Sequence, residues 1–464
     1  MVVRRAGRPA QGETAVQAPG TINLDERLPR YTSYPTAPHF AAEVDGDCYG
    51  DWLAALPPDA KGSLYLHVPF CRSMCWYCGC HTTVALRDPP VSAYLSVLRQ
   101  EIDSVAARLR TPLDVRHVHF GGGTPTILAP EDFVDLVALL RERFALHAEA
   151  EIAVEIDPRQ LSPTMIEALR EAGVNRASLG VQSFDPDVQR AINRVQGVRQ
   201  TAAVIAQLRE AGIGGVNLDL IYGLPRQSTA SCLETVERCL EMAPDRFSIF
   251  GYAHVPDFKK HQQRIALADL PDGVARQEQA EAMAQRLVAA GYVRIGLDHF
   301  ARPEDEMAQA LGSGRLRRNF QGYTTDGCEA LIGFGASAIG RLPQGYVQNE
   351  VVTGRYGERI REGGLATVRG YRLSDDDRLR ADLIERLMCD LSVDVEAVCA
   401  RHGVDPEDLV PSLARLAPLV QDGMVQRDGA FIRMPERARL LVRKVASAFD
   451  AHIDQPARRY SRAV

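Results

Sequence analysis

The chain has 464 residues with a formal net charge of -6; hydrophobic residues make up 45% and charged residues 25%. This length leaves room for about three average domains, or for one barrel-sized domain with smaller attachments. The balanced composition excludes a disordered, collagen-like or membrane-spanning chain, and no apolar run approaches about 18 residues. The negative charge argues against nucleic acid or anionic lipid as a partner.

The amino-terminal region divides into two segments. Residues 1–29 contain basic residues but no apolar stretch behind them, so we expect a disordered leader rather than a secretory signal. The next segment, RYTSYPTAPHF at residues 30–40, is aromatic and rich in proline. It is too rigid for a linker and too short for a domain. We therefore expect residues 30–50 to pack against the main domain, near its active site.

From residue 63 to residue 300, short β-branched segments alternate with longer amphipathic patterns. Such alternation is typical of βα units and a parallel sheet. Amphipathic helices are expected at 91–109 and 228–242. Strands are expected at 63–68, 115–120, 151–156, 176–181, 216–222 and 246–252, with 292–297 as a candidate seventh.

Polar or glycine-rich sequence follows nearly every expected strand. The features are a cysteine cluster, GGGTPT at 121–126, Glu155, Gln182, Asp219 and His254. A barrel takes its active-site residues from many strand ends, whereas a doubly wound sheet concentrates them at a switch point. We therefore predict an α/β fold with a partial (βα)6 TIM-like barrel of parallel strands over residues 51–375. Residues 376–464 show helical patterns without strand alternation and predict a small, mainly helical C-terminal domain.

Four of the ten cysteines fall within ten residues, in HVPFCRSMCWYCGC: Cys71, Cys75, Cys78 and Cys80. This crowding suits thiolates that converge on metal in a reducing compartment, so we expect a cytoplasmic protein. The first three have the spacing C-x3-C-x2-C. They could hold an iron–sulphur cluster that keeps one iron without a protein ligand, or a zinc ion completed by Cys80, His67 or His81.

This loop resembles that of the radical S-adenosylmethionine enzymes, with Tyr77 at the aromatic position of C-x3-C-x-aromatic-C. The resemblance implies a [4Fe-4S] cluster on Cys71, Cys75 and Cys78, and S-adenosylmethionine cleaved to a 5'-deoxyadenosyl radical. Within that superfamily, the chain is similar to the oxygen-independent coproporphyrinogen III oxidases. The matching segments, in chain order, are RYTSYPT, YLHVPFC, GGGTPT, EIDP, GVQSF, INRVQ, DLIYGLP and NFQGYTT.

The resemblance also implies site residues. A first S-adenosylmethionine would contact Tyr65, Gly122, Gly123, Thr124, Glu155 and Ile339; a second would contact Tyr77, Gln182, Arg194, Asp219 and Ala253. Without the resemblance, GGGTPT is a tight turn and not a P-loop, and Glu155 and Asp219 could belong to structural ion pairs. Cys80 is the candidate catalytic residue, because the oxidases carry this extra cysteine whereas related haem-trafficking chaperones typically do not.

The implied reaction is the decarboxylation of two propionates of coproporphyrinogen III to vinyl groups. The implied partners are this small molecule and an electron donor such as flavodoxin or ferredoxin, and we expect a monomer. A haem-binding chaperone, a haem-degrading radical enzyme and a barrel hydrolase with structural zinc stay open. Five cations could pair with the carboxylates of the substrate, and the alternative for each is a side chain that faces solvent. They are Lys259, Lys260, Arg315, Arg317 and Arg318. Ordinary burial is expected for Cys48, Cys232, Cys239, Cys328, Cys389 and Cys399.

Overall fold

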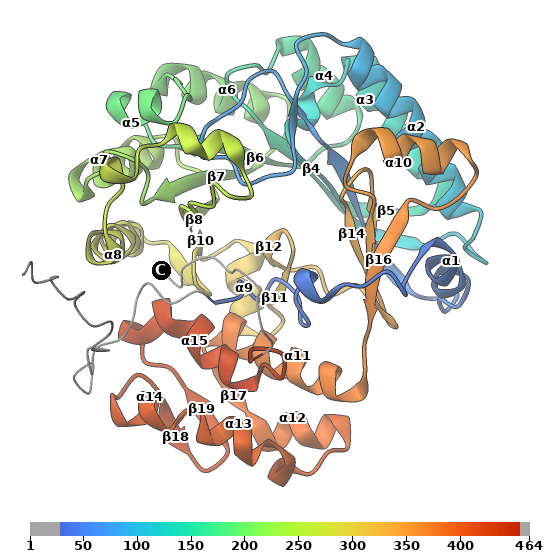
Figure 1. Ribbon diagram of the computed structural model, residues 1–464. Helices are drawn as coiled ribbons and strands as arrows, with labels where there is room; N and C mark the ends of the chain where they lie inside the picture. Colours follow the sequence, from blue (N-terminus) through green and yellow to red (C-terminus); the bar gives the residue numbers. More distant parts are fainter. Residues whose placement is uncertain (1–27, 455–464) are drawn as a thin grey trace, which may run out of the picture.

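The computed structural model describes residues 28–454, so the leader predicted for 1–29 lies almost wholly outside the described residues. Its centre is one open sheet of twelve strands in the order β16-β15-β14-β13-β1-β4-β5-β6-β7-β8-β10-β9 (Figure 1). Seven neighbouring strands of this sheet are parallel: β13 (Ala330–Phe334), β1 (Lys61–Val68), β4 (Asp114–Gly122), β5 (Ala145–Ile156), β6 (Arg176–Gln182), β7 (Gly215–Tyr222) and β8 (Arg246–Gly251).

The six main predicted strands are therefore present, and the α/β class with a mostly parallel sheet is confirmed. The candidate seventh strand at 292–297 was wrong as a parallel strand. It forms β9 (Val293–Ile295), an edge strand antiparallel to β10 (His299–Ala301). The seventh parallel strand is β13, on the other side of β1. Its five residues, ALIGF, contain a glycine and are too short to show a pattern.

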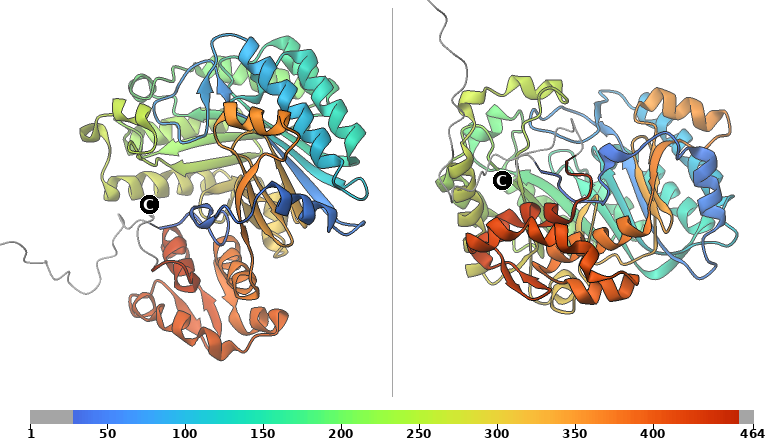
Figure 2. Two further views of the ribbon diagram at one scale, coloured as in Figure 1. Left: turned by 45° about the vertical axis from the view of Figure 1, so that its right-hand side comes forward. Right: turned by 60° about the horizontal axis from the view of Figure 1, so that its bottom comes forward.

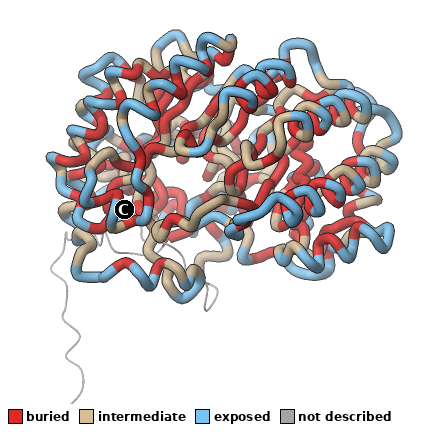
Figure 3. Tube along the Cα trace, turned by 90° about the horizontal axis from the view of Figure 1, so that it is seen from above, coloured by how far each residue is buried: buried red, intermediate tan, exposed pale blue. Residues whose placement is uncertain are grey.

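Helices cover one face of the parallel strands because those strands turn their apolar residues toward the helices. In β5, for example, Ile152, Val154 and Ile156 belong to the main hydrophobic core, and the alternate residues of the strand face the other way. Figure 3 shows buried residues gathered in the interior and exposed residues along the outer turns of the chain. The helices between or after the parallel strands are α2 (Pro89–Ala106), α3 (Pro130–Arg143), α4 (Pro163–Glu171), α5 (Pro186–Ala191), α6 (Val198–Glu210), α7 (Thr229–Glu241) and α8 (Gly273–Ala289).

Smaller elements extend the sheet and its surroundings. The antiparallel strands β14 (Ile339–Leu342), β15 (Gly345–Asn349) and β16 (Thr367–Arg372) continue it beyond β13. The strands β11 (Arg317–Asn319) and β12 (Gly322–Thr324) form a separate hairpin. Short helices complete this part of the chain: α1 (Gly46–Ala54), α9 (Glu306–Gly312) and α10 (Thr353–Arg361).

The C-terminal part has its own hydrophobic core and lies below the barrel in Figures 1 and 2. Its helices are α11 (Asp375–Asp390), α12 (Val395–His402), α13 (Val410–Ala414), α14 (Ala417–Gln421) and α15 (Val442–Ala446). The mainly helical character predicted for this part is confirmed, and a small sheet is added to it. Three strands of three residues each, β17 (Ser392–Asp394), β18 (Gln426–Asp428) and β19 (Phe431–Arg433), form a small antiparallel sheet. They are too short for alternation to be visible in the sequence.

The amino-terminal segment runs between the barrel and the C-terminal part (Figures 1 and 2). Tyr31 and Tyr34 are buried in the C-terminal core. The Tyr31 hydroxyl donates to Asp450 Oδ2 at 2.9 Å, and the Tyr34 hydroxyl accepts from Ala451 N at 2.9 Å. Further along, Phe40 stacks on Tyr346. The segment thus joins the C-terminal part to the sheet, and the domain limits and its place beside the active site stay predictions.

No helix among the described residues is both long and apolar enough to cross a membrane.

Candidate active site

The cysteine loop leaves the carboxyl end of β1 and lies between two short strands, one at its start and one after its last cysteine. These are β2 (Phe70–Cys71) and β3 (Thr83–Val84), which pair with each other in parallel. The backbone amide of Thr124 donates to Phe70 O at 2.8 Å, so the glycine-rich turn after β4 is joined directly to the start of the loop. The two motifs singled out in the sequence therefore meet at one edge of the sheet.

Each of the first two cysteine sulphurs has hydrogen-bond donors beside it. The Thr82 hydroxyl donates to Cys71 Sγ at 3.3 Å, and Thr124 Oγ1 lies 3.4 Å from the same sulphur. Arg159 Nη2 and Arg194 Nη1 both donate to Cys75 Sγ at 3.6 Å. Burial raises the pKa of Cys71, against the effect of the two hydroxyls. Hydrogen bonds to sulphur also tune bound metal centres.

Cys78 and Cys80 interact with each other. Hydrogen bonding from Cys80 lowers the pKa of Cys78 to about 7, with help from the charge of Lys259 and against the effect of burial. The same hydrogen bond, with the charge of Cys78 and burial, raises the pKa of Cys80 well above its ordinary value. Cys78 is therefore the readily ionised member of the pair, and Cys80 keeps its proton.

The spacing of the loop cysteines bears on which metal centre they fit. Around a tetrahedral zinc ion, thiolate sulphurs lie about 3.8 Å apart, given Zn–S bonds of about 2.3 Å. Among the described residues, the one group of three ligand side chains with all ligand atoms within 4.8 Å of one another is His117, Asp326 and Cys328. The loop cysteines are not part of that group, and their C-x3-C-x2-C spacing in the sequence would suit a cluster with one iron free of protein ligands.

A second set of residues lines the strand ends next to the loop. The Tyr65 hydroxyl donates to His67 Nδ1 at 3.0 Å, and His67 Nε2 donates to His81 O at 2.9 Å. Burial lowers the pKa of His67 to about 4, so the imidazole is neutral and holds this one tautomer. Tyr65 also lies beside the ring of His119, with centroids 5.9 Å apart.

Glu155 connects this set to the glycine-rich turn. Its Oε2 accepts from Gly122 N, and its Oε1 lies at hydrogen-bond distance from His119 Nε2, both at 3.2 Å. The side chain is 40% exposed, so the carboxylate is still open on one side. Ile339 is near, since it lies against Gly333, the partner of Tyr65 across the sheet. The structure thus brings together the residues predicted for the first S-adenosylmethionine.

The glycines of this turn leave room for the site's own residues. That they also let the backbone approach a ligand stays a prediction. A Cβ at Gly121 would lie 2.7 Å from Glu155 Oε1, one at Gly122 would lie 2.6 Å from the His67 ring, and one at Gly123 would lie 2.5 Å from Phe70 O. The glycines are needed because Glu155, His67 and the cysteine loop pack directly on this turn.

The residues predicted for a second S-adenosylmethionine lie around the ends of β6, β7 and β8. Arg194 is buried, donates to Gly180 O at 2.6 Å and forms an ion pair with Asp157 at 3.4 Å. Asp219 accepts from Ser178 and Asn217, and burial followed by the charge of Glu155 raises its pKa. Gln182 adopts a φ of 69°, a region that costs energy for a residue with a side chain. The ligand roles of all these residues stay predictions.

Two residues of the site, His119 and Arg159, were missed in the sequence. Asp157, which with Glu155 marks the end of the third expected strand, stands between Arg159 and Arg194, which both reach Cys75. His119 could have been found from strand alternation, because it shares a face with Gly121 on β4. Arg159 follows EIDP directly, but nothing in the sequence shows that it folds back to a cysteine 84 residues away.

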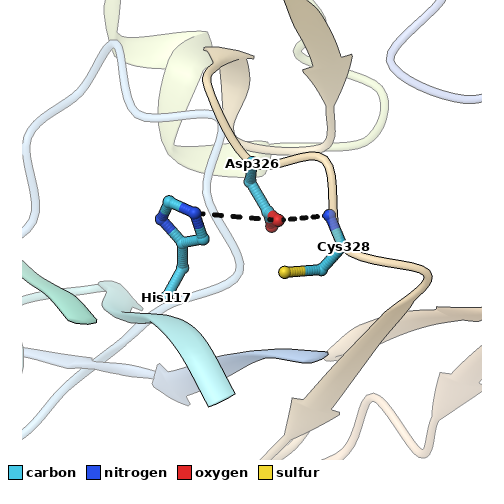
Figure 4. Close-up of side chains that lie close together, drawn as sticks. All are labelled: His117, Asp326 and Cys328. Carbon is cyan, nitrogen blue, oxygen red and sulfur yellow. Dashed lines mark hydrogen bonds and ion pairs between the residues drawn. The ribbon is translucent and has the colours of Figure 1, made fainter. Parts of the chain in front are cut away.

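The cluster of His117, Asp326 and Cys328 lies at the opposite, amino end of the strands (Figure 4). Asp326 Oδ1 accepts from Cys328 N at 2.9 Å, and Oδ2 accepts from the Ser63 hydroxyl at 2.5 Å. These side chains are of metal-binding types, but both oxygens of Asp326 already have protein donors, so the arrangement is explained without an ion. Cys328 and Cys48 are half-buried, which corrects the expectation of ordinary burial; Cys232, Cys239, Cys389 and Cys399 are buried.

Comparisons with known proteins agree with this geometry. Residues 65–239 match the Radical SAM superfamily, and residues 373–441 match the HemN C-terminal domain. The chain is 62% identical over 440 residues to the oxygen-independent coproporphyrinogen III oxidase of Bradyrhizobium diazoefficiens, covering 95% of this chain and 98% of that protein. It is 44% identical to the corresponding protein of Paracoccus denitrificans, over 95% of this chain and 97% of that one. Coproporphyrinogen III oxidase (HemN) of Escherichia coli, described as a radical SAM enzyme, has a structure with TM-score 0.88 and 38% identity, over 92% of this chain and 100% of that one.

Proposed function

This chain belongs to the oxygen-independent coproporphyrinogen III oxidases, which are radical S-adenosylmethionine enzymes, and on that premise we propose that it decarboxylates two propionate side chains of coproporphyrinogen III to vinyl groups. The product is protoporphyrinogen IX, formed without oxygen. The observation that carries the proposal is the cysteine loop at the carboxyl end of β1, with hydroxyl and guanidinium donors beside its sulphurs.

In this proposal Cys71, Cys75 and Cys78 hold a [4Fe-4S] cluster, and one iron is left for S-adenosylmethionine. When bound, these cofactors supply the 5'-deoxyadenosyl radical that takes a hydrogen atom from the propionate β-carbon. The substrate then loses carbon dioxide and one electron as the vinyl group forms, and an external acceptor takes that electron. The sum per propionate is one hydrogen atom, one carbon dioxide and one electron removed.

The protein's own groups position the reactants and exclude water. We assign the open side of Glu155, together with Tyr65, Thr124, Gly122, Gly123 and Ile339, to the first S-adenosylmethionine. We assign Tyr77, Gln182, Arg194, Asp219 and Ala253 to the second. Cys80 keeps a proton on its sulphur beside the cluster loop, and we assign it a catalytic role there.

The proposal includes partners and location. A low-potential electron carrier such as flavodoxin or ferredoxin supplies the electron that starts each cycle. The chain acts as a monomer in the cytoplasm, where free thiols such as the described cysteines stay reduced.

The test is an anaerobic assay of iron-reconstituted protein with coproporphyrinogen III, S-adenosylmethionine and dithionite. We expect two carbon dioxide molecules and two 5'-deoxyadenosines for each protoporphyrinogen IX. Stoichiometric haem binding without vinyl product would favour a chaperone, and release of iron from haem would favour a haem-degrading enzyme. Protein that binds zinc but no iron would contradict the cluster assignment.

A further inference from the structure

One short segment after β8 binds three backbone carbonyls of the cysteine loop. Lys259 Nζ donates to Cys80 O at 2.9 Å, His261 Nε2 donates to Cys78 O at 2.7 Å, and Gln262 Nε2 donates to Tyr77 O at 2.9 Å. We call these three side chains the carbonyl clamp. They come from a segment 179 to 185 residues further along the chain than the loop they bind.

Gln262 is the residue of the carbonyl clamp whose side-chain position is most fully determined by its contacts. It is completely buried, and its amide is fully used: Nε2 also donates to Ala253 O at 3.2 Å, while Oε1 accepts from Val255 N at 2.6 Å. A buried amide with all its partners in place holds a single geometry, because any other leaves a polar group unsatisfied. Gln262 therefore fixes Tyr77 relative to Ala253, two residues assigned above to the second S-adenosylmethionine.

The part of the loop bound by the clamp has no regular secondary structure. The preceding part of the loop is bound by the two residues that follow α5. Trp76 N donates to Ile192 O at 2.9 Å, and Asn193 Nδ2 donates to Met74 O at 2.8 Å. From Tyr77 to Cys80, the carbonyl clamp supplies the hydrogen bonds to the loop backbone. Hydrogen bonds from side chains thus replace the strand or helix ladder that would otherwise order the backbone around Cys78 and Cys80.

Lys259 also brings a positive charge to the loop. Its ammonium group lies 2.9 Å from the carbonyl oxygen of Cys80, two residues along the loop from the proposed cluster ligand Cys78. The neighbouring Lys260 is exposed and, among the described residues, makes no hydrogen bond or ion pair. Of these two adjacent lysines, which carry the same charge, Lys259 therefore contacts the cysteine loop and Lys260 does not.

We propose that Lys259, His261 and Gln262 are positioning residues that fix the cysteine loop from Tyr77 to Cys80, and that Lys259 also makes the reduction potential of the cluster held there less negative. This inference rests on the proposed function, since it requires the loop to hold a redox-active cluster. The physical reason is that reduction adds a negative charge, and a nearby cation stabilises the reduced state more than the oxidised one. Hydrogen bonds and net charge around a cluster are known determinants of its potential.

The first experiment compares the two lysines in the reconstituted holoenzyme. The variants Lys259→Met, Lys260→Met and Lys259→Arg are titrated with dithionite, and the reduced cluster is followed by electron paramagnetic resonance. We expect a more negative midpoint potential for Lys259→Met, an unchanged one for Lys260→Met, and a value close to the unsubstituted enzyme for Lys259→Arg. Equal potentials in Lys259→Met and Lys260→Met would overturn the charge assignment.

The second experiment tests the positioning role without the cluster. Hydrogen exchange of the loop amides is measured in iron-free protein carrying His261→Phe or Lys259→Met. Loss of one hydrogen bond should speed exchange of the loop amides roughly fivefold, with exchange in the core strands unchanged. Unchanged exchange at residues 77–80 in both variants would overturn the clamp.

The two experiments separate this inference from the proposed function. An unsubstituted protein that assembles no cluster would contradict the proposed function, while the exchange measurement on iron-free protein would still decide the clamp. A third readout is the KM for S-adenosylmethionine in Gln262→Glu, which replaces the donor amide with an acceptor. We expect the KM for S-adenosylmethionine to rise at least tenfold while the iron content is retained. An unchanged KM would contradict the proposed role of Gln262 in fixing Tyr77 relative to Ala253.

Discussion

The polar side chains at the two ends of the parallel strands differ in what they contact. At the amino end, opposite charges pair: Arg176 with Glu151 at 2.6 Å, and Arg246 with Asp305 at 2.8 Å. At the carboxyl end, the strands lead to crowded thiols with cations and hydroxyls as neighbours. Ion pairs occur at the carboxyl end too, since Asp157 pairs with Arg159 and Arg194, but there the same arginines also donate to a cysteine sulphur of the predicted cofactor site. The difference teaches that position along a strand, more than residue type, separates stability from chemistry.

The strongest test of the contrast replaces a cluster cysteine. Cys71→Ser, Cys75→Ser or Cys78→Ser should abolish product formation and cluster assembly, because the remaining thiolates cannot hold the cluster. Iron content and the resonance signal of reduced protein measure this. The matched control is Cys48→Ser, a half-buried cysteine on α1 that should keep both. A cysteine-loop variant that retains a full cluster would contradict the ligand assignment.

A second test uses two glutamates on one face of one strand. Glu155→Gln at the carboxyl end of β5 should lower turnover roughly 100-fold, since misplaced reactants cost about that factor. Glu151→Gln, four residues earlier, breaks the ion pair with Arg176 and should lower the free energy of unfolding by about 1–3 kcal/mol. Steady-state kinetics and denaturant unfolding measure the two effects. If both variants lost only stability, the contrast between the two ends would fail.

Glu101 on α2 sharpens the comparison, because it is a buried acid that serves structure near the carboxyl ends. It accepts from Gly335 N at 2.7 Å, Asn349 Nδ2 at 2.6 Å and the Tyr356 hydroxyl at 2.8 Å. Burial raises its pKa from 4.5 to about 7, against the effect of these hydrogen bonds.

The raised pKa means that the folded state binds this proton more tightly than the unfolded state. Its contribution to stability is therefore full below about pH 4.5 and is lost as pH rises to about 7, by up to about 3 kcal/mol. Denaturant unfolding across this range measures the slope, which Glu101→Gln should flatten. Identical slopes in both proteins would show that Glu101 does not titrate in this way.

The smallest expected effect lies at the amino end. Asp326→Asn weakens the hydrogen bonds to Ser63 and to the backbone of Cys328, and should cost about 1–2 kcal/mol of stability. Turnover per folded molecule should stay the same, since Asp326 lies far along the strands from the cysteine loop. A large loss of turnover with unchanged stability would assign the cluster of His117, Asp326 and Cys328 to the chemistry.

The sequence predicted those parts of the fold and site that local pattern determines. The alternation of β-branched segments with helical patterns located six of the seven parallel strands, and cysteine spacing located the predicted metal-binding loop. Contacts formed by long side chains across the chain were not predictable, because no local pattern encodes them. Arg159 and Lys259 are the examples, since each reaches the cysteine loop from a distant segment. Short elements such as β13 and the strands of the C-terminal part were missed because a few residues cannot show a period.

The contacts of Tyr31 and Tyr34 with Asp450 and Ala451 have a consequence for synthesis. These partners are 419 and 417 residues apart in the chain. While the polypeptide is made, the barrel strands can pair as they emerge, since their partners are mostly close in sequence. The aromatic segment at residues 30–40, although translated before the parallel strands, cannot reach its native place until Asp450 and Ala451 have left the ribosome. It is thus among the last segments to settle, and loss of Asp450 and Ala451 would remove these contacts of Tyr31 and Tyr34.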